Sequence, residues 1–264
     1  MGRTNKAEPG AAWGKASQII NSKRLAWTLW LLGMLGVIPL VLLLPSILPP
    51  NKLTMPMWLL SLVQFLQSGI LVAGCVLIGV KLAPKIDLHA PGLENLVSNR
   101  SFFLAFQPQV RPGLIGAVLV GMLLCFMYYF IPPDLSSTPL NHPTLLMLVV
   151  KVLYGGITEE IIARWGVMTF ILWSCWHFIQ RNQASPSRVF VWVAILFSSL
   201  LFAVGHLPVA FRLVEHLSFY MVSFILFGNL VAGGIFGYLY QRVGLESAII
   251  AHAGAHIIAS LVVL

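Results

Sequence analysis

Long apolar runs recur along almost the whole chain, and they constrain its fold more than any other feature. A run of about 20 apolar residues matches the hydrocarbon core of a bilayer, which is about 30 Å thick. The protein has 264 residues, of which 58% are hydrophobic and only 9% are charged, and its mean hydropathy is +0.89. Water-soluble globular domains do not have this composition. The sequence therefore predicts an all-α, polytopic membrane protein.

The apolar runs predict a bundle of about eight transmembrane helices. The predicted spans are residues 25–48, 56–82, 112–131, 144–163, 166–180, 188–207, 217–240 and 245–264. The stretch 144–179 is too long for one straight span, so we expect it to break at Arg164 to Gly166. In the span 217–240, Gly233 and Gly237 have the four-residue spacing that allows two helices to approach closely.

The chain divides into three predicted parts, which are a basic tail (1–24), a first group of helices with their loops (25–143) and a C-terminal group of helices (144–264). The net charge of +8 fits the excess of Lys and Arg that cytoplasmic loops of membrane proteins carry, so it does not indicate nucleic-acid binding. Most basic residues outside the spans fall on the side of the N-terminal tail. This distribution predicts that both termini are cytoplasmic.

Charged residues interrupt one apolar run, at Glu159, Glu160 and Arg164. A charge inside a bilayer span costs about 2.5 to 3.5 kcal/mol on insertion scales, so such residues usually face the bundle interior or a wet cavity. Glu160 and Arg164 are separated by one helical turn and can pair, whereas Glu159 points about 100° away. One carboxylate is then held by the arginine while the other is free for chemistry. A buried ion pair that only fixes helix packing is the alternative.

Three histidines also lie in apolar helices, and they are His206, His252 and His256. A carboxylate and a neutral imidazole together can activate water, and further donors can bind the oxyanion that forms. The same residue types can instead bind zinc as two histidines, one glutamate and a water molecule. We expect Glu159, Glu160 and His206 to share a cavity that opens to the cytoplasm.

These residues form three motifs in a fixed order along the chain. They are EExxxR at Glu159, Glu160 and Arg164, FxxxH from Phe202 to His206, and HxxxH from His252 to His256. In these motifs the sequence resembles the CAAX prenyl protease and bacteriocin-processing (CPBP) family of intramembrane proteases, also called Abi proteins. The family usually has Asn at the position of His256. The imidazole of His256 still offers a hydrogen-bond donor.

The resemblance implies an intramembrane endopeptidase whose catalytic core is 144–264. It assigns water activation to Glu159 and His206, support of these groups to Glu160 and Arg164, and oxyanion binding to His252 and His256. We expect no cofactor, with zinc as the alternative, because two glutamates and one histidine can activate water unaided. The implied partners are the lipid bilayer and a prenylated, CAAX-like or peptide substrate. The implied location is a bacterial inner membrane, with the N-terminus in the cytoplasm.

Two other functions are compatible with the same residues. Buried carboxylates, histidines and Lys151 in a membrane bundle are typical of a proton-coupled transporter. No internal repeat relates the two halves of the chain, which argues against common transporter folds. A non-catalytic membrane scaffold that retains the protease fold is the other alternative.

Overall fold

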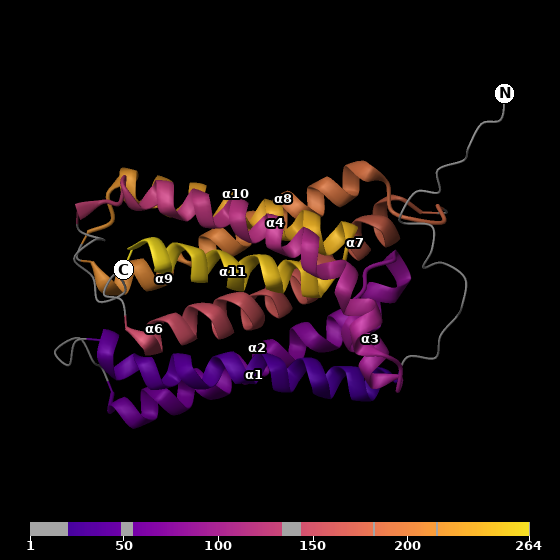
Figure 1. The fold of residues 1–264 in the computed structure, drawn as a ribbon, viewed down its shortest axis with the longest axis horizontal. Helices are drawn as coiled ribbons and strands as arrows, with labels where there is room; N and C mark the ends of the chain where they lie inside the picture. Colours follow the sequence, from indigo (N-terminus) through magenta and orange to yellow (C-terminus); the bar gives the residue numbers. More distant parts are fainter. Residues whose placement is uncertain (1–20, 49–54, 134–143, 182, 215, 264) are drawn as a thin grey trace.

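The computed structural model describes residues 21–48, 55–133, 144–181, 183–214 and 216–263, and most of them are helical, with no strand among them (Figure 1). The helical elements are α1 (Ser22–Ile47), α2 (Met57–Leu82), η2 (Ala83–Ile86), α3 (Pro91–Val97), α4 (Phe102–Tyr128), α6 (Leu145–Val150), η4 (Lys151–Glu159), η5 (Ile161–Met168), α7 (Thr169–Ser174), η6 (Cys175–Ile179), α8 (Arg188–Gly205), α9 (Leu207–Leu213), α10 (Phe219–Arg242) and α11 (Leu245–Val263). Within the described residues, 6 helices are long and apolar enough to cross a membrane. The predicted all-α, polytopic fold is confirmed.

Residues 145–179 form one continuous helix, which we call the central helix and which comprises α6, η4, η5, α7 and η6. The predicted break at Arg164 to Gly166 is therefore wrong, and the predicted fourth and fifth spans are one element. Arg164 stays inside the helix because its charge is paired within the bundle, and Gly166 stays because its missing side chain makes room for Cys75 of α2. Much of the central helix is π-helical, a rare geometry that is frequent at functional sites.

The central helix lies between α1 and α2 on one side and α8 and α11 on the other (Figure 1). Small residues make these contacts close. Thr158 donates a hydrogen bond to the Gly33 carbonyl of α1 at 2.6 Å, and a Cβ atom at Gly156 would lie 2.6 Å from the Cβ of Ala253 in α11. The predicted close contact of Gly233 and Gly237 is also present, and it is made with α8. At these small residues the central helix is therefore packed directly against the backbone of its neighbours.

The hydrophobic core joins both predicted groups of helices, since it contains residues from 25–143 and from 144–264. Packing therefore does not separate the two groups. The division of the chain at residue 143 stays a prediction that concerns function. Of the predicted basic tail, residues 1–20 lie outside the described residues, and α1 already begins at Ser22.

The helices run between two ends of the bundle. The start of α1, helix α3 and helix α7 lie at one end, which we call the basic end, while α9 and the end of α11 lie at the other, the α9 end (Figure 1). The prediction that both termini lie on one side is wrong for the described chain. The reason is that the central helix crosses the bundle once, whereas the predicted break would have made it cross twice.

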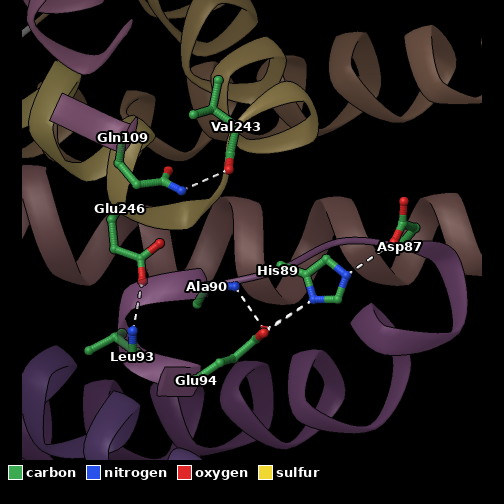
Figure 2. Close-up of polar contacts among 8 residues, drawn as sticks. All are labelled: Asp87, His89, Ala90, Leu93, Glu94, Gln109, Val243 and Glu246. Carbon is green, nitrogen blue, oxygen red and sulfur yellow. Dashed lines mark hydrogen bonds and ion pairs between the residues drawn. The ribbon is translucent and has the colours of Figure 1, made fainter. Parts of the chain in front are cut away.

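At the basic end, polar contacts fix the turn between α10 and α11 (Figure 2). The Leu245 N–H donates to the His89 carbonyl at 3.0 Å, and Gln109 Nε2 donates to the Val243 carbonyl at 2.9 Å. Gly244 has a φ of +143°, and a Cβ atom there would lie 2.7 Å from Pro91. Only glycine fits such a turn without strain. These contacts set the position at which α11 begins, and so the depth of His252 within the bundle.

The same end carries a charged cluster around His89 (Figure 2). The His89 ring nitrogens lie 3.2 Å from a Glu94 carboxylate oxygen and 3.1 Å from an Asp87 oxygen. The hydrogen bond to Glu94 raises the pKa of His89 to about 9, although partial burial opposes the shift. His89 is therefore protonated at neutral pH and ties the loop before α3 to that helix as a cation.

Candidate active site

Glu160 lies fully buried in the middle of the central helix, and two basic side chains hold its carboxylate. Arg164 Nε donates to Oε2 at 3.1 Å, and His252 Nδ1 of α11 lies 2.8 Å from Oε1. The predicted Glu160–Arg164 pair is confirmed. The contact with His252 links the first and third motifs across 92 positions of sequence. It forms because α11 packs directly against the π-helical part of the central helix.

Two phenylalanines enclose this cluster. The ring of Phe236 (α10) stacks on His252 with a centroid distance of 4.5 Å. Phe202 (α8) meets the edges of His206 at 4.7 Å and His252 at 5.9 Å, and the Arg164 guanidinium lies 5.2 Å from its centroid. Stacking and cation–π contacts of this kind stabilise a cation in an apolar setting. Phe202, the first residue of the FxxxH motif, thus brings residues of all three motifs together.

His206 lies directly after α8, and its own helix fixes the orientation of its ring. Nδ1 lies 2.9 Å from the Phe202 carbonyl oxygen. A carbonyl oxygen only accepts hydrogen bonds, so Nδ1 carries the proton and neutral His206 has a free lone pair on Nε2. This tautomer is the one that can accept a proton from water.

His252 and His256 lie one helical turn apart on α11, with ring centroids 5.0 Å apart. Both face Gly155 of the central helix, because a Cβ atom built there would lie 3.1 Å from His256 Nε2 and 3.5 Å from His252 Nε2. Since Nδ1 of His252 donates to the Glu160 carboxylate, its Nε2 is the nitrogen left for a substrate or water.

The three histidines line one cavity of about 660 Å³. It extends from Phe236 and His252, deep in the bundle, to Thr144 and Leu213 at the α9 end. Most of its other walls are apolar side chains from α4, α6, α9 and α10. Glu160 and Arg164 are fully buried behind His252 and do not line the cavity. The site therefore combines a ring of imidazoles with space for a mainly apolar molecule.

Glu159 is not among the residues that line this cavity. Its side chain is half-buried, forms no hydrogen bond or ion pair with a described residue, and interacts electrostatically with Tyr154. The two adjacent glutamates point in different directions around the helix axis, and Glu160 is the one that faces His252. The structure thus brings together Glu160, Arg164, His206, His252 and His256, while a catalytic role for Glu159 stays a prediction.

No three His, Cys, Asp or Glu side chains in the described part of the chain converge closely enough to hold a metal ion. Glu160, the carboxylate that contacts His252, already uses its two oxygens to bind Arg164 and His252. The side chains as they lie thus do not form the ligand set of the zinc alternative.

The sequence prediction missed Phe236 and gave no role at this site to Lys151, although both line the cavity. Phe236 carries no signal in the sequence, since aromatic residues are common in apolar helices. Lys151 does carry one, because it is a charged residue within a predicted span. Its position one turn before Gly155 could have linked it to the same face of the helix.

Residues 141–258 match the model of the family described as Rce1-like, type II CAAX prenyl endopeptidase. The matched segment contains the central helix and every histidine of the cavity. No curated protein and no solved structure matches the chain. The family match confirms the resemblance to CPBP intramembrane proteases. Of the three functions considered from the sequence, it supports a CAAX-type intramembrane protease.

Proposed function

We propose that this protein, which matches the Rce1-like family model, is an intramembrane endopeptidase that hydrolyses a peptide bond by histidine-activated water. The observation that carries the proposal is the orientation of two imidazoles in one cavity. The Phe202 carbonyl fixes the ring of His206, and the Glu160 carboxylate fixes the ring of His252. In both residues the Nε2 atom is left available for chemistry.

In the proposed reaction, His206 Nε2 accepts a proton from a water molecule as the water oxygen attacks the substrate carbonyl. When His252 is protonated, its Nδ1–H stays on the Glu160 carboxylate and its Nε2–H donates to the oxyanion, and His256 is the second donor. The His206 imidazolium then returns its proton to the leaving amine as the C–N bond breaks. Glu159 is the other proposed base, because its carboxylate forms no hydrogen bond or ion pair with a described residue.

The shape and polarity of the cavity support a substrate that enters from the membrane. Its walls are mainly apolar, and its volume of about 660 Å³ is in the range of known ligand pockets. An extended peptide with apolar side chains or a lipidated cysteine fits such walls, because their burial removes apolar surface from water. We propose a membrane-associated, CAAX-like protein or peptide as the substrate.

We also propose an orientation in the membrane. Basic residues gather at the basic end, namely Lys23, Arg24, Lys81, Lys85, Arg100, Arg181, Arg188 and Arg242, whereas Arg212 lies in α9. By the positive-inside rule the basic end faces the cytoplasm. The cavity then reaches the non-cytoplasmic face, so it does not open to the cytoplasm as the sequence predicted.

The orientation can be measured with reporters fused to either terminus. We expect a fluorescent protein that folds only in the cytoplasm to be bright at the N-terminus and dark at the C-terminus, and an alkaline phosphatase fusion to give the reverse. Equal cytoplasmic signals at both termini would contradict the single crossing of the central helix. Reversed signals would contradict the orientation alone.

Cleavage of a peptide by the purified protein tests the proposed function. The full-length protein in lipid nanodiscs is expected to cleave a fluorescent peptide that ends in an S-farnesylated CAAX sequence, with the products identified by mass spectrometry. Because the proposed base is a side chain, prolonged treatment with a zinc chelator is expected to leave the rate unchanged. Loss of activity with chelator and its recovery with zinc would instead establish the metal-dependent alternative.

A further inference from the structure

Lys151 places an amino group on the wall of the cavity. It begins the π-helical part of the central helix and lines the same cavity as His206, His252 and His256. Its side chain is half-buried, and none of the ion pairs among the described residues includes it. It is nevertheless close enough to His256 for the two to interact electrostatically. An ammonium group on a largely apolar wall is costly, and a bound anion offsets that cost.

The distance from Lys151 to the histidines fits a short piece of peptide. Lys151 precedes Gly155, the residue against His252 and His256, by one helical turn toward the α9 end. At the α-helical rise of about 1.5 Å per residue four residues span about 6 Å, which is an upper limit for this π-helical turn, and the long lysine side chain adds to this reach. An extended peptide covers about 3.3 Å per residue, so about two or three residues span the interval.

We propose that Lys151 binds the C-terminal carboxylate of the substrate. This proposal rests on the proposed function and adds the residue that holds the free end of a CAAX-like substrate. With the carboxylate held at Lys151, the peptide bond that meets the histidines is a few residues from the C-terminus. The enzyme would then release a short C-terminal fragment, and it would discriminate against chains whose terminus is blocked or continues.

The test changes the charge on each partner in turn. The farnesylated peptide is prepared as the free acid and as the C-terminal amide, which has the same shape but no negative charge. Wild-type protein is expected to have a kcat/KM about tenfold or more higher for the acid, the usual effect of a charge-assisted hydrogen bond. Lys151→Met, which keeps the apolar stem, is expected to cleave both peptides at the low rate of the amide. Lys151→Arg is expected to restore the preference for the acid.

Binding measurements keep this result separate from the chemical step. In a His206→Ala background, the affinity of each labelled peptide is measured by fluorescence anisotropy in nanodiscs. The acid is expected to bind about tenfold or more tightly than the amide, and Lys151→Met is expected to remove the difference. Equal affinity of both peptides for protein that contains Lys151, or an equal loss for both in Lys151→Met, would overturn the proposal. Since binding needs no hydrolysis, this outcome differs from a failure to cleave.

Discussion

Glu160→Gln is expected to abolish cleavage and to destabilise the protein more than any other single substitution at the site. The amide has the size of the carboxylate but no charge, so inside the bundle Arg164 loses its counter-ion and His252 loses the carboxylate that it contacts. Breaking a buried ion pair by removing one partner costs about 3 to 5 kcal/mol. The ring of His252 also loses the contact that fixes its orientation. A clear fall in the melting temperature of the detergent-solubilised protein is the measurement.

Two further variants make the Glu160 experiment specific. Glu159→Gln removes the neighbouring charge, which has no hydrogen bond to a described residue, so its melting temperature is expected to stay near that of the wild type. The double substitution Glu160→Gln, Arg164→Met removes both charges of the pair and is expected to recover part of the lost stability. If the double variant lost as much stability as the two single variants together, the pair would not stabilise the folded state.

His206→Ala is expected to remove activity while leaving the fold intact. The loss of a general base lowers rates by about 10² to 10⁴-fold. The hydrogen bond of His206 is to the Phe202 carbonyl of the preceding helical turn, and the ring is half-buried in the cavity wall. Its removal therefore leaves no buried charge unpaired, and the melting temperature is expected to change little. The substrate affinity measured by anisotropy is expected to persist, because the apolar walls of the cavity remain.

The same assay decides the role of Glu159. Because Glu159 is the second proposed base, the Glu159→Gln variant is expected to lose activity as His206→Ala does, again with a wild-type melting temperature. A wild-type rate for Glu159→Gln, with a strong loss for His206→Ala, would assign proton transfer to the histidine alone. The position of Glu159 outside the cavity wall makes this comparison informative.

Local patterns in the sequence predicted the local features of the site. Charges in an apolar run placed Glu160 and Arg164 inside the bundle, and helical spacing paired them, because both effects act over one turn of helix. The contact between Glu160 and His252 depends on how α11 packs on the central helix. Glycine-lined contacts such as that of Gly156 with Ala253 set this packing, and no periodicity along the chain encodes it.

The central helix shows why the topology was harder to predict than the helices themselves. Its length and the polar residues from Glu159 to Arg164 favour a break when each segment is considered alone. In the bundle, Glu160 pairs with Arg164 and also contacts His252, so no turn is needed to bring the charges of Glu160 and Arg164 to water. The side on which every later loop lies follows from this one element. Because buried charges pair in the tertiary structure, the observed topology differs from the one predicted from hydropathy.

Peptide hydrolysis by the imidazoles of this cavity is the function that we propose for this protein. The most direct measurement follows the farnesylated CAAX peptide by mass spectrometry with purified wild-type protein and with folded His206→Ala in nanodiscs. We predict a shortened peptide and its C-terminal fragment with the wild type, and intact peptide with the variant. Cleavage by the variant at the wild-type rate, or intact peptide with both proteins, would contradict peptide hydrolysis by these imidazoles.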